Sequence, residues 1–445
     1  MSAPSRTKTT TESIVIDGTA YEGGGGLIRY ALAFSSILNR PVHIHSIRAG
    51  RPGVGGLRSE HTVAVSTMAQ LTSAVVIGNH TASRELTFTP YACLDADVDV
   101  EADALSPRPV LQQQKLDVTL EGSAGIFLVA MLPYLLFSRL ACKTHHISTT
   151  TTPDEFELTI RAGTLCVKAP SIFYLRQVFL PTMELIGIGS NHLSIVPDHE
   201  QGWHTDTNKL RGKMTARIKP LLTPLPASVL DRRGRVQTVR ATAHAPPQLL
   251  DKFKETLETE LADAIARDAG VDIAVDMFPS LIDHQYHLLL AAEATAPAAF
   301  LGYEEVYPQR DVFPSDLEGD TDKIIRYLVR ACIRGLWEEL RRGHAMDENL
   351  EDMLALYQSL AVGFSSVITP QGDGCSVPEF NIETPALRDI NYKIDTGSMH
   401  RETSWWMVRQ FTGIQLGMAQ VGGSERVGCH GIGFGTEDEA GRITA

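Results

Sequence analysis

Along the first fifty residues the spacing of the apolar side chains changes twice, from alternating to helical and back to alternating. Residues 13–20 alternate apolar and polar side chains and end in an Asp-Gly turn signal, which predicts a strand. Over residues 27–38 apolar side chains recur at helical spacing. β-branched residues then return at alternate positions over residues 39–50. The pattern therefore predicts a strand, a helix and a second strand in this order.

The same reading extends along the rest of the chain. Strand-like and helix-like segments keep alternating, although no exact sequence repeat is visible. The spacing predicts strands at 85–90 and 116–122, an apolar segment at 126–141, and helices at 60–74, 169–189, 321–343, 346–363 and 400–413. This alternation is typical of an α/β fold.

The pattern changes character in the middle of the chain. Between residues 198 and 317 a strand, a long amphipathic helix and another strand are flanked by proline-containing loops. We expect a small inserted α/β domain here, which interrupts a larger domain built from residues 13–197 and 318–420.

The two ends and one late segment have the composition of loops. Residues 1–12 are polar and rich in Ser and Thr, so we expect a disordered leader. Residues 365–395 are expected to form a loop, and the Gly-rich residues 421–445 a flexible tail.

Composition narrows the class of protein. No uninterrupted apolar run of about 18 residues is found, which argues against a membrane partner. The six cysteines contain no C-x-x-C pair and are interpreted as reduced thiols in a protein of the nucleus or cytoplasm. The net charge of −13 argues against general nucleic-acid coating, so any polyanion must bind at a local basic patch.

Two glycine-rich loops carry the first candidate chemistry. Four glycines at 23–26 follow Glu22 and precede the first predicted helix, where unpaired backbone N–H groups favour an anion. A second loop contains Arg48, Arg51 and Arg58 and ends at His61. Arginines beside two glycine loops suggest phosphate binding. The alternatives are a flexible turn for the glycines and a solvated rim for the arginines.

Four segments, in this order, resemble the RNA 3'-terminal phosphate cyclases. They are IDGTAYEGGGGLIRYALAFSSI, IRAGRPGVGGLRSEH, LEGSAGIFLVAMLP and MDENLEDMLALYQSLAVG. The resemblance implies a fold of the α+β type, in which three repeated units of two helices and four strands form a large domain that carries a small inserted α/β domain. It also implies an enzyme that uses ATP to convert an RNA 3'-phosphate into a 2',3'-cyclic phosphate through a histidine–AMP intermediate.

The resemblance assigns roles to individual residues. His400 matches the nucleophile that accepts AMP, Glu22 matches a carboxylate that holds a divalent cation (Mg or Mn), and Asp352 orients His400 or a metal. The expected ATP contacts are Gly23, Gly24, Gly25, Arg29, Asn349, Leu350, Glu351, Asp352 and Met353. The expected contacts with the 3'-phosphate of the RNA partner are Arg48, Arg51, Arg58 and His61.

Some residues depart from the motifs of that family. Gly26, Glu60 and Met353 replace glutamines, and Asn349 replaces a histidine. Two further functions therefore remain open. One is a non-catalytic relative that binds ribosome-assembly proteins, and the other is a nucleotidyltransferase for another phosphate-ended substrate. Taken alone, His400 and Asp352 would also be ordinary exposed helix residues. The sequence does not identify the RNA or the oligomeric state.

Overall fold

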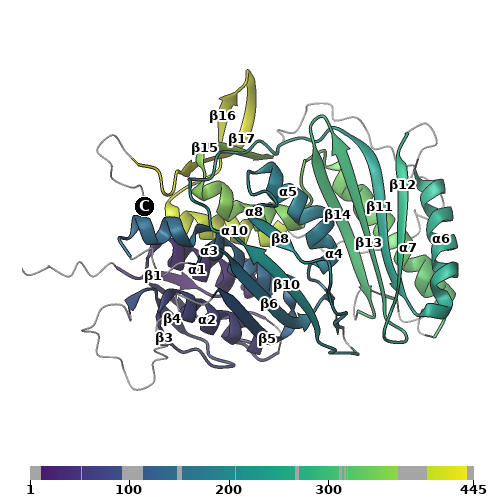
Figure 1. Ribbon diagram of the computed structural model, residues 1–445, viewed down its shortest axis with the longest axis horizontal. Coiled ribbons are helices and arrows are strands. Elements are labelled where there is room, and N and C mark those ends of the chain that lie inside the picture. The colour runs from purple at the N-terminus through teal and green to yellow at the C-terminus, as the bar shows by residue number, and fades with distance from the viewer. Residues whose placement is uncertain are drawn as a thin grey trace, which may run out of the picture.

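The chain folds into several small sheets covered by helices, as the computed structural model in Figure 1 shows. The structure describes residues 12–51, 53–92, 114–147, 153–205, 207–265, 270–309, 313–314, 317, 319–368 and 398–437. The expected α/β class is confirmed. The predicted disordered leader lies outside the described residues, except for Glu12.

The first unit contains the strand, helix and strand that the opening pattern predicts. Its elements are β1 (Ile14–Asp17), α1 (Gly25–Leu38), β2 (Val42–His45), α2 (Ser59–Thr72), β3 (Val75–Ile77) and β4 (Leu86–Thr89). The sheet order is β1-β2-β4-β3, in which β1 and β2 are parallel and the other pairs are antiparallel. Apolar residues of β1 and α1 are buried between the sheet and the other helices.

The second unit repeats this topology. Its strands are β5 (Lys115–Ser123), β6 (Phe156–Gly163), β8 (Leu193–Ile195) and β10 (Gly212–Ile218), and its helical segments are α3 (Ala124–Thr144), α4 (Ile172–Tyr174), η3 (Leu175–Phe179) and α5 (Leu180–Leu185). The order β5-β6-β10-β8 again has one parallel pair followed by two antiparallel pairs. The two units therefore share one strand arrangement despite the absence of an exact sequence repeat.

One helix of the second unit passes a simple test for a membrane span. Among the described residues, α3 is long and apolar enough to cross a bilayer, but 83% of its most apolar window is buried inside the fold. The helix packs against α1, α2 and β6. Its composition is therefore explained by its place in the core.

The third unit differs from the other two. It contains α8 (Glu348–Leu360), β15 (Val362–Ile368), α10 (Ser398–Thr412), β16 (Gly417–Val421) and β17 (Ser424–Ile432), with the strand order β15-β17-β16. In place of a fourth regular strand, Pro226 and Val229 form isolated parallel bridges with β15. The resemblance implied four strands in each unit, and the described residues show three here.

The inserted segment forms a sheet of its own. Strands β11 (Arg235–Ala245), β12 (Asp272–Pro279), β13 (Tyr286–Thr295) and β14 (Ala299–Tyr307) pair in the order β12-β11-β13-β14. Helices α6 (Leu250–Ala264) and α7 (Thr321–Arg341) cover it, after a short turn at η4 (Pro247–Leu249). Figure 1 shows this sheet at one end of the molecule. β7 (Leu165–Cys166) and β9 (Trp203–His204) form a separate small parallel pair.

Two loop predictions are wrong. The expected flexible tail at 421–445 contains β17, which pairs with both β15 and β16, and the expected loop at 365–395 begins inside β15. In both cases glycines and small polar residues occupy strands whose backbone pairing does not require apolar side chains. A Cβ atom on Gly428 would also lie 2.0 Å from the backbone oxygen of Ser365 in β15, and one on Gly431 would lie 2.2 Å from that of Ala361, just before β15. Residues 369–397 lie outside the described residues.

Candidate active site

The backbone of the glycine loop lies directly against the side chains of Glu22 and His61. Gly24 caps α1 without any side-chain hydrogen bond, and the first turn of α1 contains no acidic residue. A Cβ atom on Gly24 would lie 2.2 Å from Oε1 of Glu22, and one on Gly25 would lie 2.6 Å from Nε2 of His61. These glycines are therefore required by close packing, and they leave the N-terminal N–H groups of α1 without a side-chain cap.

The last described helix lies beside this loop. α10 packs between α8 and α1, and Nδ1 of His400 lies 2.8 Å from Oε2 of Glu22. The backbone N–H of Glu22 also donates a hydrogen bond to Oγ1 of Thr403 on α10, at 3.3 Å. The fold thus joins two segments that are almost four hundred residues apart in sequence.

The contact between His400 and Glu22 changes the pKa of both groups. Contact with Glu22 is the largest effect on His400 and, against partial burial, raises the pKa of its ring. Burial favours the neutral form of Glu22, but the contact and charge of His400, together with Arg51 and Arg29, outweigh burial and lower its pKa. The pair is therefore stabilised as an imidazolium and a carboxylate.

Arginines surround the same carboxylate. Arg51 forms an ion pair with Oε1 of Glu22, and its Nε donates to the backbone oxygen of Glu22 at 3.0 Å. Arg48 is buried, has a left-handed backbone (φ 53°), and its Nε has no hydrogen-bond partner. Burial, then the charges of Arg58 and Arg51, lower the pKa of Arg48. Three guanidinium groups close enough to repel one another define an anion site.

His61 has a fixed tautomer at the start of α2. The backbone N–H of Arg58 donates to Nδ1 of His61 at 3.1 Å, so the remaining proton of the neutral ring is on Nε2, which points at Gly25. Burial and the charges of Arg48, Arg29 and Arg58 lower the pKa of His61 to about 3. His61 is therefore a neutral hydrogen-bond donor over the glycine loop at physiological pH.

Asp352 approaches the site from α8. Burial is the main cause that raises the pKa of Asp352 to about 6, and its Oδ1 has no hydrogen-bond partner. Its charge in turn raises the pKa of His400, which places the two groups within electrostatic reach. The hydroxyl of Tyr30, on α1, donates to the backbone oxygen of Asp352 and joins α8 to α1.

The other residues expected to contact ATP from α8 differ in their position. Asn349 is exposed and Met353 is half-buried, so their side chains are accessible. Leu350 is fully buried in the core, and Glu351 is 3% exposed at its side chain. Helical periodicity turns the side chains of Leu350 and Glu351 inward, so a contact of these two positions with the nucleotide would involve their backbone, and their role in ATP binding stays a prediction.

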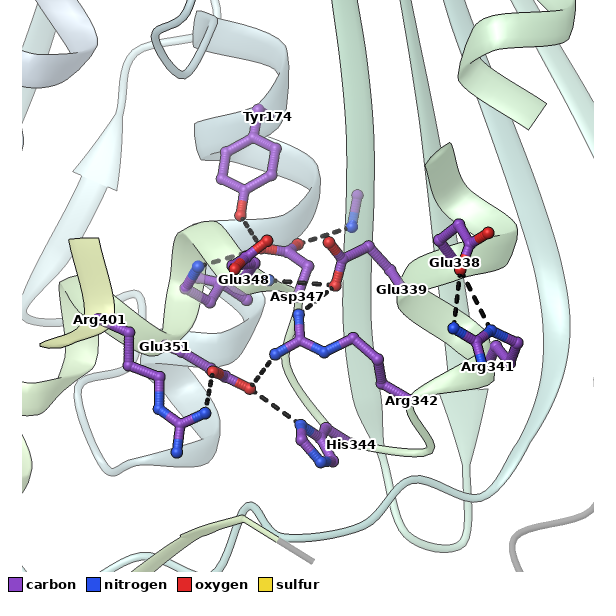
Figure 2. A network of polar contacts seen from close by, with 12 residues as sticks. Tyr174, Glu338, Glu339, Arg341, Arg342, His344, Asp347, Glu348, Glu351 and Arg401 are labelled. Atoms are coloured by element: carbon purple, nitrogen blue, oxygen red, sulfur yellow. Dashed lines mark hydrogen bonds and ion pairs between the residues drawn. The ribbon is translucent and has the colours of Figure 1, made fainter. Parts of the chain in front are cut away.

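Buried Glu351 instead belongs to a polar network drawn in Figure 2. Its Oε1 accepts from Arg342 at 2.8 Å and from Nδ1 of His344 at 2.9 Å, and its Oε2 forms an ion pair with Arg401 at 3.5 Å. Sequence spacing gave no signal for Arg401, Thr403 or Tyr30, because each of them meets a partner that is distant in sequence. Arg342 and His344 are near Glu351 in sequence, but they lie outside its helix, so helical spacing did not pair them.

Two observations test whether the site fits a nucleotide and a cation. Oδ1 of Asp352 is buried without a hydrogen bond and is available to a hard cation, whereas the two oxygens of Glu22 are paired with Arg51 and His400. The described residues contain no group of three or more His, Cys, Asp or Glu side chains placed to hold a metal. A divalent cation here would therefore take most of its ligands from phosphate and water, and contact with Glu22 would replace one of its present ion pairs.

Comparisons with known proteins identify the family of this chain. The profile of the family "RNA 3'-terminal phosphate cyclase" matches residues 20–418. This protein therefore belongs to the RNA 3'-terminal phosphate cyclase family.

Individual relatives carry the same name. The chain is 28% identical over 355 residues to the RNA 3'-terminal phosphate cyclase of Sulfolobus acidocaldarius, covering 79% of this chain and 88% of the relative. It is 27% identical over 357 residues to that of Ignicoccus hospitalis, with 80% and 87% covered. It is also 24% identical over 425 residues to that of Pyrobaculum aerophilum, with 95% and 99% covered.

Proposed function

We propose that this protein is an ATP-dependent RNA 3'-phosphate cyclase that acts through adenylated His400. The observation that carries the proposal is the 2.8 Å contact between Nδ1 of His400 and Glu22, beside the uncapped N-terminus of α1. A histidine, an anion-binding helix start and an arginine cluster are the groups that nucleotidyl transfer to an imidazole requires. Membership of the family supports the same activity.

The contact also selects the nucleophilic nitrogen. Nδ1 of His400 faces Oε2 of Glu22, so in the neutral ring the proton stays on Nδ1 and Nε2 keeps its lone pair. In the first step Nε2 attacks the α-phosphorus of ATP, a nitrogen–phosphorus bond forms, and the bond to pyrophosphate breaks. Glu22 stabilises the positive charge that develops on the ring during this step.

The glycine loop and the arginines hold the phosphates. The free N–H groups at the start of α1 would donate hydrogen bonds to a phosphate oxygen, and Nε2–H of His61 would donate from the other side of Gly25. Arg48 and Arg51 neutralise charge that moves to the leaving pyrophosphate. Mg²⁺ or Mn²⁺, held by Glu22 and Asp352 together with phosphate oxygens, would supply further charge neutralisation.

Two further transfers complete the reaction. An oxygen of the RNA 3'-phosphate attacks the AMP phosphorus, and the bond to Nε2 of His400 breaks. The neighbouring 2'-hydroxyl oxygen then attacks the 3'-phosphorus, loses its proton, and AMP leaves with the bridging oxygen. His400 is regenerated. In this scheme the guanidinium groups of Arg48, Arg51 and Arg58 position the RNA end.

The test uses three oligonucleotides of one sequence that end in a 3'-phosphate, a 3'-hydroxyl or a 5'-phosphate. With ATP and Mg²⁺ we expect only the 3'-phosphate to become a phosphatase-resistant 2',3'-cyclic end. Transfer of AMP to the 5'-phosphate without cyclisation would instead identify a nucleotidyltransferase for another phosphate end. No reaction with any of the three, together with no AMP on the protein, would favour a non-catalytic platform.

A further inference from the structure

Glu351 and Arg401 form a link between α8 and the first turn of α10. Figure 2 shows Arg401 reaching from α10 to Glu351, whose other oxygen is held by Arg342 and His344. Arg401 directly follows His400, and Glu351 directly precedes Asp352. The link therefore lies behind the two residues whose relative position the proposed chemistry requires.

The link is one of few constraints on this turn. α10 begins at Ser398, only two residues before His400, and follows residues that lie outside the described range. The described side-chain contacts that tie this first turn to other elements are His400 with Glu22, Arg401 with Glu351, and Thr403 with the Glu22 backbone. Because His400 is half-exposed, packing alone does not fix its ring.

Because Glu351 is buried and fixed, it sets the position of Arg401 and not the reverse. The Glu351 side chain is 3% exposed, and its Oε2 makes no hydrogen bond, so the charge of Arg401 is the interaction that this oxygen has on the α10 side. Arg342 and His344 hold the other oxygen at 2.8 and 2.9 Å, which prevents the carboxylate from turning away. A carboxylate fixed from behind can set where the arginine, and with it the helix start, comes to rest.

We propose that Glu351, acting through Arg401, is a positioning residue that holds His400 against Glu22 for attack on the α-phosphorus. This inference rests on the proposed function for its kinetic consequence. A displacement of about 1 Å at a reacting atom lowers a rate by about 100-fold, so loss of the link changes the rate of adenylation more than the affinity for ATP.

The principal test variant is Arg401→Gln, because its side chain is 30% exposed and its loss leaves Glu351 paired with Arg342 and His344. The matched control is Arg330→Gln, which breaks the similarly buried pair of Arg330 and Glu260 (24% and 15% exposed) between α7 and α6. Arg401→Lys keeps the positive charge of the ion pair, and Glu351→Gln removes its negative charge.

Single-turnover adenylation with ATP and Mg²⁺ gives the kinetic readout. We expect Arg401→Gln and Glu351→Gln to lower the maximal rate by about 10- to 100-fold with little change in KM for ATP. Arg401→Lys should recover part of the rate, the double variant should be no slower than the slower single variant, and Arg330→Gln should match the wild type. Additive losses, or a raised KM in Arg401→Gln that Glu351→Gln does not reproduce, would overturn the proposal in favour of direct ligand contact.

A second readout does not depend on activity. The His400 ring can be titrated by proton NMR, with its signal assigned by its loss in His400→Asn. Contact with Glu22 raises the pKa of His400, so loosening α10 should return that pKa toward its ordinary value in Arg401→Gln but not in Arg330→Gln. An unchanged pKa in Arg401→Gln would overturn the inference. If the pKa moves but the wild type is never adenylated, the positioning role holds and the proposed function fails.

Discussion

Glu351 and Asp352 are neighbours in α8, yet the fold treats their carboxylates in opposite ways. Glu351 is neutralised by Arg342, His344 and Arg401. Asp352 has a buried oxygen without a hydrogen bond and a pKa raised to about 6 by burial. Each carboxylate has one buried oxygen without a hydrogen bond, but that of Glu351 forms an ion pair with Arg401, whereas burial of Asp352 outweighs the nearby charges of Arg29 and His400. A buried carboxylate with compensated charge supports the structure, whereas one whose burial is not compensated destabilises the fold unless a ligand supplies further charge. Within one turn of α8, Glu351 therefore supports the fold, whereas Asp352 faces the candidate site.

The largest effect on stability is expected at Glu351, which contacts three basic side chains. Glu351→Gln leaves Arg342, His344 and Arg401 without their common carboxylate, so we expect the free energy of unfolding to fall by about 3–5 kcal/mol. Urea denaturation followed by tryptophan fluorescence measures this change. Glu260→Gln, in a more exposed pair, should cost less. An equal fall in the free energy of unfolding of Glu351→Gln and Glu260→Gln would contradict the prediction that the contacts of Glu351 contribute more to stability.

The opposite sign is expected at Asp352. Its folded pKa of about 6 lies above the unfolded value of 3.8, so the stability that it contributes is present below pH 3.8 and is lost as pH rises toward 6. At pH 7 Asp352→Asn should therefore stabilise the protein by up to about 3 kcal/mol, at 1.36 kcal/mol per pKa unit. Adenylation should fall at the same time, because the proposed cation would lose the charge of Asp352.

This gain should disappear in acid. Thermal melts of the wild type and Asp352→Asn at pH 7 and pH 4 test the sign directly, because both side chains are neutral in the folded state at the lower pH. A variant that is less stable than the wild type at pH 7 would show that Asp352 is satisfied in the folded protein.

A smaller effect is expected in the pH dependence of the first step. Attack requires a neutral His400 ring, and contact with Glu22 raises the pKa of that ring, so the rate of adenylation should rise with pH through this raised pKa. Glu22→Gln removes the charge that raises the pKa of His400 and should move the rising limb to lower pH. Single-turnover rates across pH 5–9 measure the limb, and an unmoved limb would show that Glu22 does not act on His400.

The sequence predicted the elements better than the contacts. Regular periodicity in β1, α1 and α2 revealed secondary structure because burial imposes a fixed spacing on one face. β15 and β17 contain glycine and small polar residues and lack a clear alternating apolar pattern, so the sequence did not predict them as strands. They are stabilised by backbone pairing. For the site, Glu22, Arg51 and His400 were predicted from residue type and resemblance, and the structure brings them together. The pairing of Glu351 with Arg342, His344 and Arg401 could not be predicted, because only the tertiary packing shows which face of α8 turns inward.

The central claim is that Nε2 of His400 forms a bond to AMP. Incubation of the wild type and His400→Ala with α-labelled ATP and Mg²⁺, followed by denaturation and peptide mapping, tests it most directly. The account predicts acid-labile AMP on the peptide that contains His400, and none on the variant. A wild type that stays unlabelled, or a variant that is labelled equally, would contradict it.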